Sequence, residues 1–188
     1  MAHEDRTRWD TIYRQRSQQQ LPDPDPFLFD YTPPVSAHEE RRALDIAGGQ
    51  GQNGLWLAAQ GYTVDVMDIS RMALARGRQE MIARGLRRLN FLPVDLDTVE
   101  LEPGRYDVVC VFRYLKRELF PALRACVRPG GRIIYETYNT HYQEIVPAFN
   151  PAFLLQPGEL AGLFADWKLL HASDTQHVSR LAALKPGR

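Results

Sequence analysis

The stretch from Arg42 to Ser70 constrains the fold more than any other part of this chain. A short apolar run over residues 43–46 ends at glycines, and residues 55–59 then stay apolar for longer than a turn would. A second apolar run over 62–67 ends at an acid, Asp68. This order of buried strand, glycine-rich turn, helix, buried strand and acid is half of a nucleotide-binding α/β unit.

The turn and the acid together predict a cofactor that contains adenosine. Gly48, Gly49 and Gly51 permit positive backbone angles and leave room for a ligand to approach the main chain. Asp68 follows Gly48 by twenty positions, at the carboxyl end of the second strand. There its carboxylate can accept hydrogen bonds from both ribose hydroxyls, or it can cap the helix that begins near Ser70.

Two kinds of cofactor fit these residues. The run Gly49-Gln-Gly-Gln-Asn-Gly54 satisfies the dinucleotide fingerprint G-x-G-x-x-G, which alone is a weak signal. Asp45, near the end of the first strand, favours S-adenosylmethionine, because its carboxylate would hold an ammonium group, directly or through water, and would repel a pyrophosphate. The backbone donors of Gln52 and Asn53 at the helix start suit a carboxylate, and their side chains either contribute or only cap.

The stretch resembles motif I, D-x-G-x-G-x-G, of class I S-adenosylmethionine-dependent methyltransferases, with Ala47 at the position of the first glycine. Trp9-Asp-Thr-Ile-Tyr13 resembles the N-terminal helix of small-molecule methyltransferases related to the tellurite-resistance type, whose aromatic residues close over the cofactor. Further similar segments are 91–96, 105–115, 127–137 with its Pro-Gly-Gly turn, and 150–160. The resemblance implies a cofactor-binding set of Trp9, Tyr13, Asp45, Ala47, Gly48, Gly49, Gly51, Asn53, Asp68, Ile69, Asp95, Leu96 and Phe112.

Within this set Asp95 is expected to lie against the adenine amino group, although Asp95 or Asp97 would equally suit the cap of a turn.

Strands and helices alternate from residue 42 onward, which predicts an α/β fold with a parallel sheet covered by helices on both faces. We expect strands near 43–47, 63–67, 89–92, 107–112 and 131–136, and helices near 52–60, 71–84, 116–127 and 157–165. Residues 167–173 and 178–185 suggest a terminal pair of strands joined near Asp174. The family resemblance implies a Rossmann-like seven-stranded order, 3-2-1-4-5-7-6, with strand 7 antiparallel.

Residues 1–41 are expected to form an N-terminal helix and a proline-rich cover on a single methyltransferase domain, residues 1–188. Helical spacing predicts a helix over 3–16. Residues 21–34 predict a loop, because proline removes donors and restricts its neighbours. Its apolar anchors either cover the site or pin the loop to the outside: Phe27, Leu28, Phe29 and Tyr31. We expect His38 to begin a helix that runs into Arg41.

Bulk composition excludes some partners. The 188 residues carry a formal net charge of zero, so no global basic field would gather nucleic acid. A basic cluster at helical spacing favours a solvated face: Arg76, Arg78, Arg84, Arg87 and Arg88. Cys110 and Cys126 suit small core residues, and the sequence shows neither a membrane span, a metal-ligand spacing nor a secretion signal. A soluble cytoplasmic protein without a metal is the expectation.

Candidate catalytic residues follow the fourth and fifth strands. Arg113 would neutralise an anionic acceptor or pair with Glu136 in a structural salt bridge, and Tyr114 would orient the acceptor. Glu136 or His141 would accept a proton, although a loop histidine also suits a solvent-facing position. Methyl transfer from a sulfonium is an in-line displacement, so a base is needed only for an acceptor that must lose a proton early.

The sequence therefore predicts S-adenosylmethionine-dependent methyl transfer to a small-molecule acceptor. Two alternatives are a protein that binds S-adenosylmethionine or S-adenosylhomocysteine without turnover, and an NAD-binding module.

Overall fold

A computed structural model describes residues 2–187, which form two compact units, residues 1–100 and 101–188. The first unit holds three parallel strands and four helices. Its elements are α1 (Ala2–Gln15), α2 (Pro26–Tyr31), β1 (Arg42–Ile46), α3 (Gln52–Ala59), β2 (Thr63–Asp68), α4 (Arg71–Ala83) and β3 (Leu89–Pro93). β1 pairs with β2, and β2 pairs with β3.

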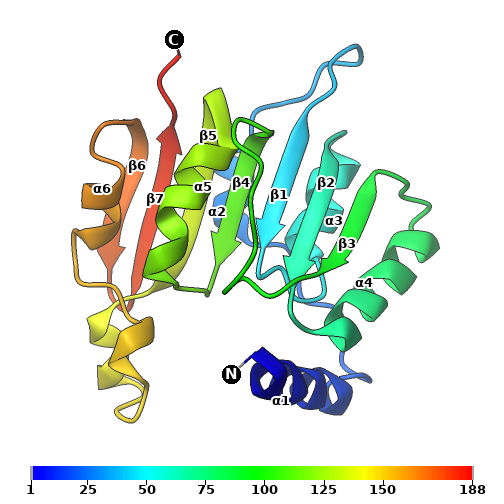
Figure 1. Cartoon of the computed structure of the whole chain (residues 1–188), viewed down its shortest axis with the longest axis horizontal. Helices are drawn as coiled ribbons and strands as arrows, with labels where there is room; N and C mark the ends of the chain where they lie inside the picture. The colour runs from blue at the N-terminus through cyan, green and yellow to red at the C-terminus, as the bar shows by residue number, and fades with distance from the viewer. Residues whose placement is uncertain (1, 188) are drawn as a thin grey trace. The chain divides into compact units, whose positions relative to one another are not determined.

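Helices cover the strands of the first unit. β1 and β2 are buried along nearly their whole length, which is the pattern of parallel strands inside an α/β domain. α3 packs on β1 and β2, and α4 packs on β2 and β3. α1, in dark blue in Figure 1, lies against α4. The carboxyl ends of β1 and β2 therefore open onto the glycine turn and the start of α4.

The second unit begins at Leu101 and holds four strands. Its elements are β4 (Tyr106–Phe112), η1 (Arg117–Leu119), α5 (Phe120–Cys126), β5 (Val127–Tyr138), η2 (Thr140–Glu144), η3 (Pro151–Phe153), α6 (Glu159–Leu163), β6 (Lys168–Thr175) and β7 (Val178–Leu184). β4 and β5 are parallel, whereas β7 runs antiparallel to both β5 and β6. Cys110 and Cys126 are buried in this core, as expected.

The sheet order is β3-β2-β1-β4-β5-β7-β6, which confirms the expected Rossmann-like order with its antiparallel strand 7 (Figure 1). Several boundaries differ from expectation. The helix expected over 116–127 is a 3-10 turn followed by α5, and the helix expected over 157–165 shortens to five residues in α6. β5 extends beyond 131–136 at both ends, because the Pro-Gly-Gly turn is part of the strand at its start and Tyr138 still pairs with β7 at its end.

The prediction that residues 21–34 lack a helix was wrong. α2 forms because Asp25 caps it, accepting the N–H of Phe27, and because Pro26 stands at the first helical position, where its missing donor costs nothing. Leu28 is fully buried, and Phe29 packs on Trp56 of α3 with ring centroids 4.6 Å apart. These anchors pin the segment to α3.

The helix expected to begin at His38 is also absent, since residues 37–38 form a turn and 39–41 run extended into β1.

Candidate functional site

The glycine turn joins β1 to α3 through a series of left-handed residues. Ala47, Gly49 and Gly51 have φ values of 51°, 58° and 74°. The N–H of Gly51 donates to the carbonyl of Gly48 at 2.8 Å, which closes the turn. A Cβ at Gly48 would lie 2.7 Å from the Asp45 carboxylate, so this position accepts only glycine without rearrangement. The main chain of the turn is therefore bare.

Asp68 ends β2 beside this turn and is 8% exposed. Its Oδ2 accepts the N–H of Gly49 at 2.8 Å, and its Oδ1 accepts the N–H of Ser70 at 2.8 Å. Burial raises the pKa of the Asp68 carboxyl above its ordinary value, against the backbone N–H donors of Ser70, Gly49 and Ile69. A carboxylate has about four lone-pair sites, so Asp68 keeps acceptor capacity for a ribose hydroxyl. The cap of α4 is Ser70 and not Asp68, so the capping role considered for Asp68 was wrong, whereas the ribose role stays a prediction.

Asp45 lies beneath the turn and is 1% exposed. Its Oδ2 accepts the N–H of Gly54 at 3.0 Å, near the start of α3. This contact fixes the first turn of the helix to the end of β1. Asn53 is 2% exposed, and its Oδ1 accepts the N–H of Asp25 at 2.8 Å. The Asn53 side chain thus holds the chain segment that precedes α2.

Tyr13 of α1 covers the glycine turn. A Cβ built at Gly49 would lie 2.4 Å from the Tyr13 hydroxyl oxygen, so the phenol rests directly on the bare main chain. Burial, and then the negative charge of Asp68, raises the pKa of Tyr13 to about 12. Trp9 is 40% exposed on the same helix, with its ring 6.2 Å from that of Tyr13. Both aromatic residues expected at the cofactor are therefore on α1, and Tyr13 is the one at the turn.

The residues expected at the adenine lie after β2 and β3. Ile69 is half-buried and Leu96 is buried, which leaves apolar surface near the acid. Asp95 is half-buried, and its Oδ1 accepts the N–H of Asp97 at 2.9 Å. Asp95 thus caps a turn, the alternative considered from the sequence, and keeps a second oxygen for a ligand.

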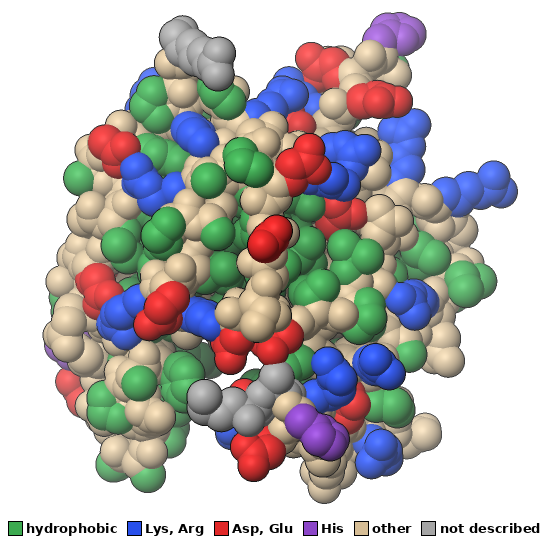
Figure 2. Space-filling view, viewed as in Figure 1, with side chains coloured by type: hydrophobic (Ala, Val, Ile, Leu, Met, Phe, Trp, Pro, Cys, Tyr) green, Lys and Arg blue, Asp and Glu red, His purple; other side chains and the backbone are tan. Residues whose placement is uncertain are grey.

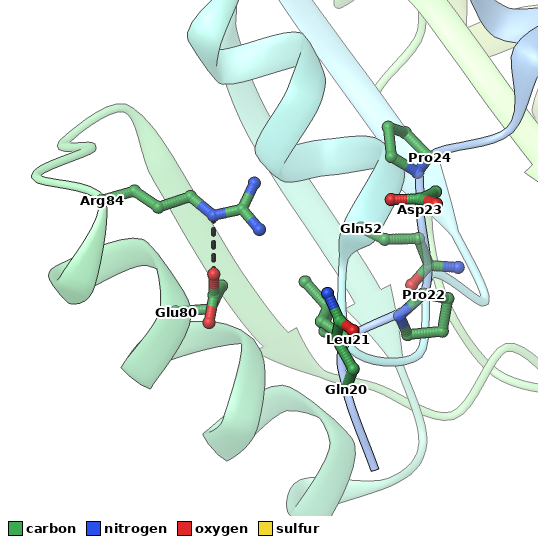
Figure 3. Close-up of a pocket in the computed structure, with 8 residues that line it drawn as sticks. All are labelled: Gln20, Leu21, Pro22, Asp23, Pro24, Gln52, Glu80 and Arg84. Carbon is green, nitrogen blue, oxygen red and sulfur yellow. Dashed lines mark hydrogen bonds and ion pairs between the residues drawn. The ribbon is translucent and has the colours of Figure 1, made fainter.

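A small cavity lies beside the start of α3. Figure 3 shows its lining, where the chain from Gln20 to Pro24 passes Gln52, and where Arg84 pairs with Glu80 at 2.7 Å. Its volume of about 160 Å³ is below the roughly 300–1,000 Å³ of ligand sites for drug-sized molecules. The cavity is therefore a gap behind the glycine turn and not the nucleoside site.

In the second unit, two arginines meet one buried acid near the end of β5: Arg113 follows β4, and Arg180 lies in β7. Glu136 is 5% exposed. Its Oε2 accepts a hydrogen bond from Arg180 Nε at 2.6 Å, and its Oε1 lies 4.0 Å from Arg113. Arg180 was not anticipated from the sequence, although it stands directly opposite Glu136 in the antiparallel β5–β7 register. The structural pairing expected of Arg113 is thus made mainly by Arg180.

Arg113 has a left-handed backbone, with φ of 56°, and its N–H donates to the Glu136 carbonyl at 2.8 Å. Its side chain is 53% exposed. Such a conformation is costly for a residue with a side chain and often marks a functional position. Phe112, just before it, is buried at 7% exposure. Tyr114 is half-buried, and its carbonyl accepts the hydroxyl of Tyr135 at 2.7 Å.

An aromatic group follows β5. Tyr138 and Tyr142 stack with centroids 4.0 Å apart, and Phe149 meets both rings edge-on. Burial raises the pKa of Tyr138, and Arg113 opposes that rise. His141 lies on the outer side of this segment, exposed, with its Nδ1 3.1 Å from Glu144 Oε1. His141 is therefore solvent-facing, and the stacked tyrosines were not anticipated.

Three of the five arginines of the basic cluster have partners within the fold. Arg76 donates to the carbonyl oxygens of Arg16 and Gln19, and Arg78 donates to that of Phe91. Arg84 pairs with Glu80. Figure 2 shows Lys and Arg side chains interspersed with Asp and Glu on the face drawn. In residues 2–187, no helix is long and apolar enough to cross a membrane.

This fold and this site define an α/β domain that binds a nucleoside-containing cofactor, and comparison with known proteins specifies it further. A family model described as "Methyltransferase domain" matches residues 43–131. Hemagglutinin 1 of Eikenella corrodens is 31% identical over 72% of this chain and 49% of its own length. A ubiquinone biosynthesis O-methyltransferase of Burkholderia vietnamiensis is 29% identical over 65% of this chain and 61% of its own length.

A tRNA 5-carboxymethoxyuridine methyltransferase of Escherichia coli is 28% identical over 55% of this chain and 42% of its own length. The chain thus spans about half the length of these curated relatives. Among solved structures, TehB from Haemophilus influenzae superposes with a TM-score of 0.73 at 18% identity, covering 94% of this chain and 66% of TehB. An S-adenosylmethionine-dependent methyltransferase from Mesorhizobium loti gives 0.69 at 18% identity, covering 85% and 96%.

Residues 43–131 thus match a methyltransferase-domain family model, and the chain has the fold of S-adenosylmethionine-dependent methyltransferases.

The residues of the first unit fit the family's cofactor. Gly49 has no side chain where a nucleoside would approach, although the Tyr13 hydroxyl lies over it, and the Asp68 carboxylate stands beside it with acceptor capacity left. S-adenosylmethionine, when bound, supplies an activated methyl group on a sulfonium. The fit requires Tyr13 to pack beside the ligand or to move from Gly49.

Proposed function

We propose that this protein transfers a methyl group from S-adenosylmethionine to a small-molecule acceptor. The observation that carries the proposal is the bare glycine turn with Asp68 hydrogen-bonded to it at 2.8 Å. Asp68 would accept the ribose hydroxyls, with Ile69 and Leu96 against adenine. Asp45 and Asn53 would act mainly by shaping the turn and the helix start, because both are buried and hydrogen-bonded to main-chain donors.

On the acceptor side, Arg113 is the residue proposed to contact the acceptor. Its strained backbone and exposed guanidinium support this role, and Tyr114 follows it directly. Both carboxylate oxygens of Glu136 face an arginine, which favours an orienting role over proton transfer. His141 remains the candidate proton acceptor for a hydroxyl substrate, and thiolates or other anions would need none.

A small acceptor is favoured over nucleic acid because three of the five arginines of the basic cluster, Arg76, Arg78 and Arg84, bind carbonyl oxygens or acids of the chain itself. The name of the Burkholderia relative makes phenols the first acceptors to test. A cytoplasmic location is part of the proposal and is supported by two buried cysteines that form no disulfide.

Calorimetry with S-adenosylmethionine, S-adenosylhomocysteine and NAD tests the cofactor. Mass spectrometry of S-adenosylhomocysteine formed in the presence of phenols, thiols and carboxylates tests turnover. Binding and turnover of the sulfonium are expected, without NAD binding. Tight binding with no turnover for any acceptor would favour a non-catalytic binding protein, and affinity for NAD alone would overturn the proposal.

The acceptor role of Arg113 has its own test. Arg113→Ala should raise KM for the acceptor about tenfold or more while the affinity for S-adenosylhomocysteine stays unchanged. Arg105→Ala, which removes a half-buried arginine paired with Glu102 in the same unit, is the control.

A further inference from the structure

Asp10 of α1 makes a pair of hydrogen bonds that the cofactor site alone does not explain. Its Oδ1 accepts the hydroxyl of Ser70 at 2.7 Å and the N–H of Met72 at 3.1 Å. Ser70 is fully buried and already caps α4, since its Oγ accepts the N–H of Ala73. The Asp10 carboxylate therefore joins α1 to the first turn of α4, the helix that follows Asp68.

These contacts are part of a series that starts and ends on α1. Ser70, which is bonded to Asp10, donates its N–H to Asp68, and Asp68 accepts the N–H of Gly49. The hydroxyl of Tyr13, also on α1, packs on Gly49. Asp10 and Tyr13 are three residues apart, on neighbouring positions of the same helix face. The position of the Tyr13 phenol therefore depends on where Asp10 is held.

A second contact holds the other end of α1. Arg76 of α4 donates to the carbonyl oxygen of Arg16 at 2.8 Å, one residue beyond the end of the helix. Breaking the Asp10 contact would thus free the body of α1 while its carboxyl end stays attached. α1 cannot rely on its own stability, because a helix of 14 residues is marginal in water.

We infer that Asp10 is a positioning residue for the cofactor: its bonds to Ser70 and Met72 hold α1 so that Tyr13 closes over the glycine turn. The inference rests on the proposed binding of S-adenosylmethionine at this turn. It adds a residue that touches no part of the cofactor and acts through Tyr13.

The test compares Asp10→Ala, Asp10→Asn, Tyr13→Ala and the Asp10/Tyr13 double variant by calorimetry with S-adenosylhomocysteine. Asp10→Ala should weaken binding about tenfold, and Asp10→Asn, which keeps an acceptor oxygen, should recover most of that loss. If Asp10 acts through Tyr13, the double variant should bind within about twofold of Tyr13→Ala. Asp5→Ala, exposed on the same helix, is the control and should bind as the wild type does.

Hydrogen exchange of the ligand-free protein supplies a readout that does not depend on binding. Asp10→Ala should speed exchange across residues 2–15, whereas loss of a mere helix cap would speed it only in the first turn of α4. The inference would be overturned if the losses of affinity in the two single variants multiply in the double variant, or if hydrogen exchange in α1 is unchanged in Asp10→Ala. A wild type that binds no S-adenosylhomocysteine would instead overturn the proposed function, and exchange would still decide how α1 is held.

Discussion

The Asp68 carboxylate accepts the N–H of Gly49 at 2.8 Å, so the acid that ends β2 is tied to the turn that ends β1. The ends of β1 and β2 thus form one surface, because the hydrogen bond couples the position of Gly49 to that of Asp68. A ligand that contacts the acid also meets the bare main chain beside it. This link makes Asp68 the most informative position for mutation.

Asp68→Ala should weaken S-adenosylhomocysteine binding by about 1–3 kcal/mol, through loss of charge-assisted hydrogen bonds to ribose. Calorimetry measures the change, and circular dichroism confirms that the variant is folded. Asp30→Ala, which removes an exposed acid from α2, should bind normally. An unchanged titration for Asp68→Ala would refute the ribose role.

As the pH is lowered, cofactor affinity should begin to fall at a higher pH than it would with an aspartate of ordinary pKa. Burial raises the pKa of Asp68 above 3.8, and ribose hydroxyls donate to the ionised form, so affinity is lost as pH falls through the raised value. The effect on the fold has the opposite sign. A raised folded pKa stabilises the protein below pH 3.8, and this contribution is lost as pH rises through the raised value.

Binding curves from neutral pH down to about pH 5 measure the effect on cofactor affinity, apart from the effect on the stability of the fold. Asp68→Asn should bind weakly at every pH and lose the dependence, and a variant that keeps the full dependence would assign it to another group.

Ala47→Gly should stabilise the protein by about 1 kcal/mol. The left-handed backbone at Ala47 costs about 1–2 kcal/mol for a residue with a Cβ, and glycine removes this cost. Part of the gain in stability is lost, because glycine also gives the unfolded chain more conformational freedom. Thermal and urea unfolding measure the difference. Ala75→Gly, in the exposed face of α4, should destabilise by a similar amount. A loss of stability in Ala47→Gly would contradict the strain.

Arg180→Ala should destabilise the protein more than Arg113→Ala. Glu136 is 5% exposed, and removing the arginine at 2.6 Å leaves a buried acid poorly paired, at a cost of about 1–3 kcal/mol. Arg113 lies 4.0 Å away and is half-exposed, so its loss should cost under about 1 kcal/mol. Urea unfolding gives both values. Equal losses would mean that the two arginines hold Glu136 equally.

The sequence predicts the features whose signals are local. The apolar runs and the glycines define β1, α3 and β2, and the position of Asp68 follows from the end of a strand. α2 was also locally readable, since Asp25 and Pro26 are good residues for the cap and the first position of a helix. The prolines in residues 21–34 led to the prediction of a loop instead.

The contacts that the sequence does not predict join distant segments. Asp10 and Ser70 are 60 residues apart, and Glu136 and Arg180 are 44 apart. Neither pair has a spacing that a helix or a hairpin would impose. The second pair becomes visible only once the antiparallel register of β5 and β7 is known. Side chains that meet through tertiary packing therefore escape a reading of periodicity.

The hydrogen bond from the Asp25 N–H to Asn53 bears on how this protein should be shortened for experiments. A fragment limited to residues 43–131, the matched family segment, would lose Asp25, α1 and α2 together. Asn53 would then face water in place of its backbone donor, and the ring of Trp56 would lose the cover of Phe29. Fragments cut at the homology boundary would report on a damaged pocket, so expression and crystallisation trials should retain the first forty residues.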